Sequence, residues 1–238
     1  MKLVDNSDLS TRFATLTTAH LADACVRVGV EVRCAPSGMH AVHPGWRLIG
    51  RALPAQHVGS VDVFLEAFMN AQPGDILVAD NAGRLDESCV GDLVTLEARE
   101  AGLGGIVIWG LNRDSVDIEA IGLPVFSLGR IPTGPLFAGP HADDALSTAK
   151  VGQWTLTNED IVAGDEDGVL FFPASKADEI LGHAETIRDT ERAQAIRIAT
   201  GTSLRAQVRF DDYLAAREQN PALTFREHLR TVGGEIEV

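Results

Sequence analysis

GDLVTLEAREAGLGGIVIWGLNRD, residues 91–114, carries the clearest structural signals in this chain. From Asp92 onward, apolar residues recur at helical spacing among good helix formers, and Gly102 follows as a typical C-terminal stop. A helix is therefore expected to begin at Asp92. Residues 106–109 then form a short, wholly apolar, β-prone run between glycines, which predicts a strand buried on both faces.

Polar residues follow this strand at its carboxyl end. Arg113 and Asp114 come soon after it. A second helix is expected over residues 114–121, directly after Arg113. In α/β sheets, functional sites form beyond the carboxyl ends of the strands. The order of the elements therefore predicts a site that includes Asp92, Arg113 and Asp114.

The start of the first helix offers hydrogen-bond donors to an anion. A helix that begins at Gly91 and Asp92 leaves unpaired amides, among them those of Leu93 and Val94, and its dipole favours a negative charge. The planar guanidinium of Arg113 suits the same anion, because it donates paired hydrogen bonds. An anion such as a carboxylate is therefore the expected ligand of this segment.

Asp114 and Asp92 supply hard oxygen ligands of the kind that Mg²⁺ or Mn²⁺ takes, and few are needed because magnesium keeps several waters. Each residue alone also has a simpler explanation. An Asp at a helix start is a common N-cap, and an isolated arginine such as Arg113 commonly forms a surface ion pair of little energetic value. The joint spacing of the three residues is what favours a functional site.

That spacing, Asp92 followed by Arg113 and Asp114, resembles the D-X20-R-D signature of the pyruvate-releasing 4-hydroxy-4-methyl-2-oxoglutarate aldolases, which belong to the RraA-like family. The resemblance covers most of residues 15 to 200. Besides the signature it rests on these stretches: LADACVRVGV (21–30), GWRLIGRAL (45–53), AQPGDILVAD (71–80), IGLPVFSLG (121–129) and VAGDEDGVLFFP (162–173).

The resemblance implies an α/β fold of the three-layer β/β/α swivelling-domain type, assembled as homotrimers or hexamers with the site at a subunit boundary. It implies that Asp114 binds a divalent metal directly and that Arg113 contacts the substrate. The turn from Gly91 to Val94 would hold the pyruvate carboxylate, and we expect Asp92 to reach the metal through water. Other family members regulate ribonuclease E and lack the full signature, whereas this chain has it.

The longest helical pattern, residues 175–200, contains a charged residue within its apolar stripe. Glu191 lies four residues from both Ile187 and Ala195 on that stripe. In the aldolases, a glutamate from the C-terminal region of a neighbouring subunit completes the water shell of the metal. Glu191 is the candidate for this role, with Glu185 as the alternative.

Composition excludes several classes of function. The 238 residues carry a formal charge of −14, which argues against a nucleic-acid surface and against binding to anionic membranes. A Schiff-base aldolase needs a lysine amine, and none of the lysines falls within the motif; they are Lys2, Lys150 and Lys176. The metal-dependent class II mechanism is therefore favoured.

The cellular location is expected to be cytoplasmic. The three cysteines are odd in number and follow no CxxC spacing, which fits reduced thiols. The first ten residues lack the apolar core of a signal peptide, and no run approaches the ~18 apolar residues of a membrane span.

The remaining patterns alternate between helix and strand, as in α/β proteins. Residues 1–200 are expected to form the catalytic domain, and residues 201–238 a helical arm that docks on a neighbouring subunit. Asn81 to Val90 reads as a loop that leads into the motif helix, and residues 163–168 read as a turn. Asp80, Asn81, Asp86 and Glu87 either line the pocket or are solvated, and solvation is favoured for most of them. The other expected elements are helices over 10–29 and 61–71 and strands over 47–56, 75–80, 123–128, 151–157 and 168–172.

Taken together, the sequence predicts a divalent-metal-dependent lyase that cleaves a 4-hydroxy-2-oxo acid to pyruvate, with oxaloacetate decarboxylation as a second activity. The rival interpretation is a non-catalytic regulator that binds a ribonuclease E-type enzyme, since one fold supports both. A methyltransferase dependent on S-adenosylmethionine is disfavoured, because residues 102–105 (GLGG) precede their strand instead of following one.

Overall fold

The computed structural model describes residues 5–140 and 142–232. They form two compact units, Met1–Leu181 and Gly182–Val238. Helix α6 (Ala177–Ala199) begins in the first unit and ends in the second. The division into a catalytic domain ending near residue 200 and a docking arm stays a prediction.

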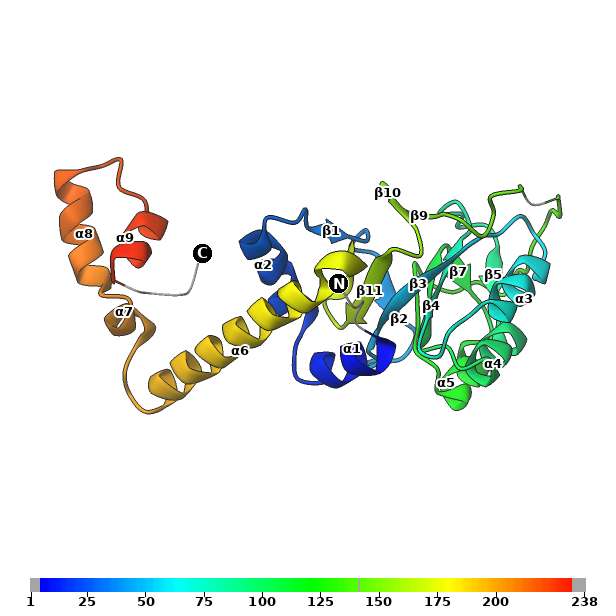
Figure 1. Ribbon diagram of the computed structural model, residues 1–238, viewed down its shortest axis with the longest axis horizontal. Coiled ribbons are helices and arrows are strands. Elements are labelled where there is room, and N and C mark those ends of the chain that lie inside the picture. Colours follow the sequence, from blue (N-terminus) through cyan, green and yellow to red (C-terminus); the bar gives the residue numbers. More distant parts are fainter. Residues whose placement is uncertain (1–4, 141, 233–238) are drawn as a thin grey trace. The chain divides into compact units, whose positions relative to one another are not determined.

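The first unit is built on a mixed eight-stranded sheet (Figure 1). Its central strands β3, β4, β6 and β8 are parallel, and the strands on either side join antiparallel. In spatial order the strands are β1 (Arg33–Cys34), β12 (Gly168–Pro173), β11 (Asp160–Asp165), β3 (Leu48–Gln56), β4 (Ile76–Asp80), β6 (Gly105–Trp109), β8 (Val125–Ser127) and β2 (His40–Ala41).

Three helices cover one face of the parallel strands: α3 (Asp62–Met69), α4 (Asp92–Glu100) and α5 (Ser115–Ile121) (Figure 1). Successive strand residues point to opposite faces of a sheet. Leu77 and Ile106 accordingly pack in the core beneath these helices, while Ile76 and Val107 pack in the core on the other side. Burial on both faces explains why these strands are almost wholly apolar.

The core on the other side is closed by a hairpin of β9 (Ala149–Val151) and β10 (Trp154–Leu156), which pair antiparallel. Ala149, Val151 and Leu156 are buried there beside residues of β4, β6 and β12. The unit thus has β, β and α layers, and the α/β class predicted from the sequence is confirmed.

One predicted helix and one predicted strand are wrong. The single helix expected over 10–29 is two helices, α1 (Asn6–Phe13) and α2 (Thr18–Val28). A new helix start lies at Thr17, whose hydroxyl accepts from the amide of His20, while the His20 ring accepts from the amide of Thr17. The strand expected over 151–157 is the β9–β10 hairpin, which turns at Gly152 with φ of +61°.

The turn expected over 163–168 is mostly strand. β11 extends through Asp165 and pairs with β12, so only Glu166 and Asp167 connect the two strands. The other predicted helices and strands in the first unit are confirmed within a few residues at their ends.

Short helices make up the second unit after α6: α7 (Leu204–Gln207), α8 (Phe210–Gln219) and α9 (Phe225–Val232). The expected short helices are present in the described part of the tail, and residues 233–238 lie outside it. The rings of Tyr213 and Phe225 meet edge to face with centroids 5.1 Å apart, and aromatic contacts of this kind join α8 to α9.

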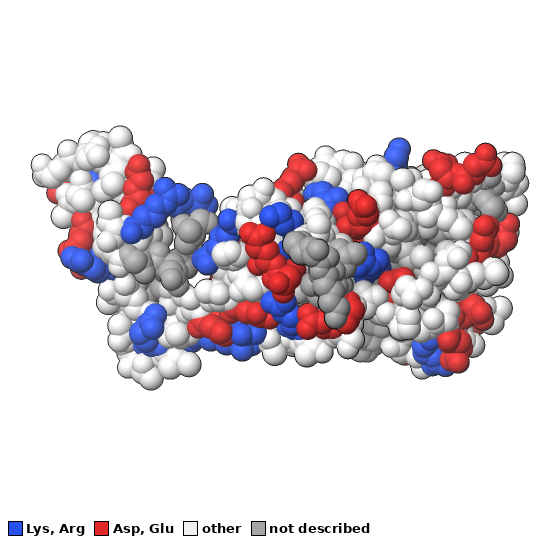
Figure 2. Space-filling view, in the orientation of Figure 1, with Lys and Arg blue, Asp and Glu red and all other residues white. Residues whose placement is uncertain are grey.

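Among the described residues, no helix combines the length and apolarity that crossing a bilayer requires. Figure 2 shows Asp and Glu side chains interspersed with Lys and Arg on the face that it presents. This mixture fits the acidic net charge and differs from the clustered basic surface of nucleic-acid-binding proteins.

Candidate active site

A small parallel sheet of two strands brings the two halves of the sequence motif together. β5 (Ser88–Val90) pairs with β7 (Leu111–Asn112), and the amide of Arg113 donates to the carbonyl of Val90 at 3.0 Å. β5 leads directly into α4, and β7 leads directly into Arg113 and Asp114. The start of α4 and the Arg113–Asp114 pair therefore lie side by side.

Gly91 lies at the point where these segments touch. A Cβ on Gly91 would be 2.4 Å from Asp114 Oδ2 and 3.2 Å from Arg113 Nε. Its φ of −132° and ψ of −162° are available to any residue, so glycine is needed here for space and not for backbone conformation.

The side chains of Arg113 and Asp114 contact each other and remain accessible. Arg113 Nε lies 3.2 Å from Asp114 Oδ2, and the two side chains are 46% and 35% exposed. Accessible groups of this kind can exchange the contact between them for contacts with a ligand. The pair is therefore suited to binding a ligand, and screening by solvent limits its value for stability.

Asp114 has an uncommon backbone conformation. With φ of 56° and ψ of 38° it is left-handed, a region that Asp and Asn enter more readily than most other residues. It occupies the N-cap position of α5, yet its side chain makes no capping hydrogen bond. Its carboxylate faces Gly91 and Arg113 instead. The simple N-cap explanation of Asp114 is therefore wrong.

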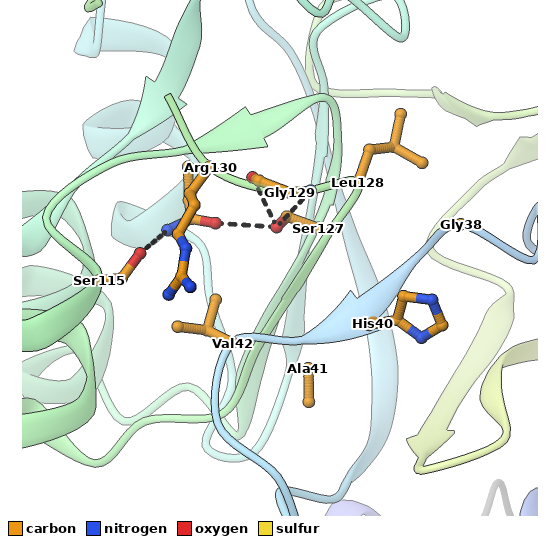
Figure 3. Close-up of a pocket in the computed structure, with 10 residues that line it drawn as sticks. Gly38, His40, Ala41, Val42, Ser115, Ser127, Leu128, Gly129 and Arg130 are labelled. Carbon is orange, nitrogen blue, oxygen red and sulfur yellow. Dashed lines mark hydrogen bonds between the residues drawn. The ribbon is translucent and has the colours of Figure 1, made fainter. Parts of the chain in front are cut away.

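The turn that carries Asp114 is held by buried polar side chains (Figure 3). Asn112 Nδ2 donates to Ser115 Oγ at 3.0 Å, and Asn112 Oδ1 accepts from Ser127 Oγ at 2.8 Å. Asn112 is 1% exposed and Ser127 is 3% exposed. This network fixes the residues on either side of Arg113 and Asp114.

The first turn of α4 lines a cavity of about 160 Å³. The first α-helical hydrogen bond runs from the Thr95 amide to the Gly91 carbonyl, so the amides of the three preceding residues have no place in the helical ladder. One of them, the Leu93 amide, donates to Asp92 Oδ1 at 2.8 Å. The lining residues are Val61, Ser88, Cys89, Val90, Gly91, Asp92, Leu93, Val94, Arg113 and Pro135.

Cys89 is the one thiol among these lining residues, and burial excludes it as a nucleophile. The side chain is 4% exposed, and desolvation raises the pKa of the thiol far above its ordinary value. Because the thiolate is the reactive form, Cys89 contributes packing and not chemistry.

A loop that contains Gly134 lies close to the guanidinium of Arg113. A Cβ on Gly134 would be 2.7 Å from Arg113 Nη1. The loop is anchored by Glu87, which is 1% exposed, accepts from the Leu136 amide at 2.7 Å and pairs with Arg84 at 3.0 Å. The expectation of solvated loop residues is wrong for Asn81 and Glu87, because Asn81 is 2% exposed and the buried Glu87 stabilises this loop.

A second cavity, of about 270 Å³, is lined by both Arg113 and Asp114. It includes Arg130, which is not among the site residues predicted from the sequence. The available signal was its position, because Arg130 follows the strand expected over 123–128 at the same edge of the sheet. The lining residues are Arg113, Asp114, Ser115, Arg130, Ile131 and Pro132.

The donor set around Asp114 suits a magnesium-type ion. The described residues contain no group of three or more His, Cys, Asp or Glu side chains placed to hold a metal. A zinc site takes three or four protein ligands, whereas magnesium keeps several waters and uses one or two carboxylates. Asp114 supplies one such accessible carboxylate, and Asp92 lines the neighbouring cavity.

Glu191 lies exposed on the part of α6 that belongs to the second unit. Only the first half of the expected stripe is buried: Ile187 is 3% exposed, whereas Ala195 is exposed to solvent. The role of Glu191, or of Glu185, in the metal shell of a neighbouring subunit stays a prediction.

Comparisons with known proteins agree with the resemblance. A family model described as RraA-like, Aldolase/RraA, matches residues 18–171. A protein of Halalkalibacterium halodurans named "Putative 4-hydroxy-4-methyl-2-oxoglutarate aldolase" is 26% identical over 189 residues, which cover 79% of this chain and 87% of that protein. Protein DlpA of Legionella pneumophila is 28% identical over 196 residues, covering 79% of this chain. The match spans only 31% of the length of DlpA.

Solved structures include close matches to the fold. RraAS2 of Streptomyces coelicolor, described as an unusual member of the RNase ES inhibitor RraA protein family, superposes with a TM-score of 0.70 at 26% identity. The superposition covers 83% of this chain and all of that one. The expected RraA-like fold is thereby confirmed, and proteins similar to this chain carry names of both enzymes and RNase inhibitors.

Proposed function

The chain belongs to the RraA-like family, and on that premise we propose that it is a divalent-metal-dependent lyase acting on 4-hydroxy-2-oxo acids. A substrate such as 4-hydroxy-4-methyl-2-oxoglutarate would yield pyruvate and a second oxo compound. The observation that supports this most is the contact of Asp114 with Gly91 and Arg113, which joins a carboxylate suited to a metal, a guanidinium and a helix N-terminus.

In this reaction the hydroxyl at C4 loses its proton, the C3–C4 bond breaks, and its electron pair moves to the 2-oxo acid fragment. Protonation at C3 then gives pyruvate. A magnesium or manganese ion held by Asp114, with Asp92 and a neighbouring subunit's Glu191 reaching it through water, would withdraw electrons from the 2-oxo acid group.

The protein groups bind and orient the substrate in this proposal. Gly91, Leu93 and Val94 at the start of α4 would bind the carboxylate of the pyruvate half. The Leu93 amide already donates to the side chain of Asp92. The Asp92 side chain would therefore turn away when the substrate carboxylate binds this amide. Arg113 would stabilise the negative charge that develops on the substrate oxygen.

The same arrangement supports oxaloacetate decarboxylation, because loss of CO₂ from oxaloacetate leaves the electron pair on the same pyruvate fragment. A lysine-based route has no support in the described residues. Lys150 and Lys176 line neither of the two cavities beside Arg113, and Lys2 lies outside the described residues.

We further propose a homotrimer or a dimer of trimers with the site at a subunit boundary. Large apolar side chains are exposed around the site, and contact with a second subunit would remove them from water. Leu93 is 75% exposed, Val116 is 79% exposed and Phe137 is 64% exposed. Sedimentation that shows a stable, active monomer would contradict this assembly.

One assay tests the function directly. Pyruvate release is measured from a panel of 4-hydroxy-2-oxo acids and oxaloacetate, after a chelator and again after magnesium or manganese is restored. We expect turnover that disappears with the chelator and returns with the metal. If borohydride traps the substrate covalently on the protein, the reaction uses a Schiff base, and this would contradict the metal mechanism. No turnover of any compound would favour the alternative, a regulator of ribonuclease E-type activity.

A further inference from the structure

Arg130 is fixed next to the candidate site by its backbone. The Asn112 amide donates to the Gly129 carbonyl and the Ile131 amide donates to the Asn112 carbonyl, both at 3.0 Å. These bonds form a parallel bridge between Asn112 and Arg130. Arg130 is therefore aligned with the residue that directly precedes Arg113.

The side chain of Arg130 extends into open space beside Ser115 and Val42 (Figure 3). It lines a cavity of about 210 Å³ with these residues, and it also lines the 270 Å³ cavity that contains Arg113 and Asp114. Its guanidinium has no hydrogen bond or ion pair with any residue that the structure describes. An arginine directed into a cavity without a protein partner is available to a ligand.

The charges in the 270 Å³ cavity favour an anion. Its lining contains two arginines and one carboxylate, and the carboxylate of Asp114 is already paired with Arg113. Arg130 therefore leaves the cavity with an uncompensated positive charge. Its planar fork of donors matches a carboxylate in particular, because two parallel hydrogen bonds can form.

We propose that Arg130 binds a second carboxylate, at the end of the substrate remote from the 2-oxo acid group. This inference rests on the proposed function, in which the start of α4 holds the first carboxylate. The two anion sites share Arg113, because it lines both the 160 Å³ cavity and the 270 Å³ cavity. Arg130 then determines the preference of the site for 4-hydroxy-2-oxo diacids, such as the substrate named above, over monoacids.

A pair of unreactive ligands tests this assignment by calorimetry. 2-Oxoglutarate and 2-oxopentanoate share the 2-oxo acid group and differ in the terminal carboxylate. With magnesium present, Arg130→Ala is expected to weaken 2-oxoglutarate binding by about 10- to 100-fold, since hydrogen bonds to charged groups have that value. Binding of 2-oxopentanoate is expected to stay within about twofold of wild type, because that ligand lacks the group that Arg130 binds.

The variants include their own controls. Arg130→Lys keeps the charge without the fork and should recover part of the 2-oxoglutarate affinity. Arg205→Ala removes the same charge from an exposed position on α7, outside both cavities, and should leave both affinities unchanged. A melting curve of each variant verifies folding, and if the Ala variant is unfolded the Lys variant carries the test.

The outcomes separate this inference from the proposed function. Equal losses for the two ligands, or no loss for either, overturn the role of Arg130 while pyruvate release by the wild type upholds the lyase. A wild-type protein that releases no pyruvate and binds neither ligand overturns the proposed function, and the role of Arg130 with it.

Discussion

The carboxylate of Asp114 lies so close to Gly91 that a Cβ at residue 91 would be only 2.4 Å from Asp114 Oδ2. Real Cβ atoms do not tolerate such a contact, so either Asp114 or the start of α4 must move when residue 91 gains a side chain. The contact joins the metal-binding carboxylate of the proposed site to the helix start that would bind the substrate.

Gly91→Ala is expected to lower kcat/KM by about 10²-fold, because misplacing a catalytic group by 1 Å costs about that much. The double variant with Asp114→Ala provides the control. Once the carboxylate is gone the clash is relieved, so Gly91→Ala should add little further loss in that background. Additive losses in the kinetic cycle would show that the two residues act independently.

Asp114→Asn is expected to abolish activation by added magnesium and to lower kcat by at least about 10²-fold, since it removes the ion's charged ligand. Asn tolerates the left-handed backbone at this position, so the melting temperature should hardly change. Asp114→Ala would add a backbone cost of about 1 kcal/mol. Normal metal activation of the Asn variant would mean that the metal binds elsewhere.

Arg113→Lys is expected to be nearly as damaging as Arg113→Ala. The proposed role needs a planar fork held in one place, and a lysine supplies a point charge with different donor geometry. Loss of one donor of this kind costs about 10²–10³ in kcat. Steady-state kinetics of both variants beside melting curves provide the measurement. A Lys variant within a few-fold of wild type would mean that Arg113 supplies only long-range charge.

Gly134→Ala is expected to lower activity without unfolding the protein. The added Cβ would be 2.7 Å from Arg113 Nη1, and the flexible end of an arginine can give way at small cost in stability. Activity should fall by about 10- to 100-fold, because the guanidinium leaves its position. An unchanged kcat/KM would show that the loop does not restrain Arg113.

His57 is expected to make the protein less stable as the pH falls. The ring is 8% exposed, stacks on Phe64 and pairs with Asn81 at 2.9 Å, and burial lowers its pKa below the ordinary value. Below about pH 6.5 the unfolded chain gains a proton that the folded chain resists, so the free energy of unfolding decreases toward acid. Above that pH the contribution of the neutral ring is complete.

The measurement is the melting temperature of wild type and His57→Phe between about pH 5 and pH 7.5. Phenylalanine keeps the stacking on Phe64 and removes the titrating group. The wild type should therefore lose more stability toward acid than the variant does. Parallel curves for the two proteins would show that the pKa of His57 is not lowered by folding.

Local signals explain the part of the fold that the sequence predicts well. The helix from Asp92, the strand over 106–109 and the helix near 114–121 have distinct periodicities and end at glycines, and the structure confirms them. The break between α1 and α2 was missed because the cap at Thr17 has His20 in the place where Glu or Gln is usual.

Tertiary contacts explain what the sequence does not predict. The burial of Glu87 depends on Leu136, which is distant in sequence, and no local pattern records that pairing. Arg130 likewise joins the cavity through its backbone bridge to Asn112. The motif spacing identifies Asp92, Arg113 and Asp114 as candidates, but their contact with Gly91 requires the parallel pairing of β5 and β7.

The β5–β7 pair is hydrogen-bonded apart from the eight-stranded sheet, and this separation has a consequence for protein engineering. Substitutions in the large sheet can change thermal stability while β5 and β7 stay paired. The hydrogen bond from the Arg113 amide to the Val90 carbonyl is then kept. Arg130 lies on a different segment, one that follows β8. A library confined to Arg130 and its direct chain neighbours would therefore vary the proposed choice of substrate while Asp92, Arg113, Asp114 and Glu191 stay as they are.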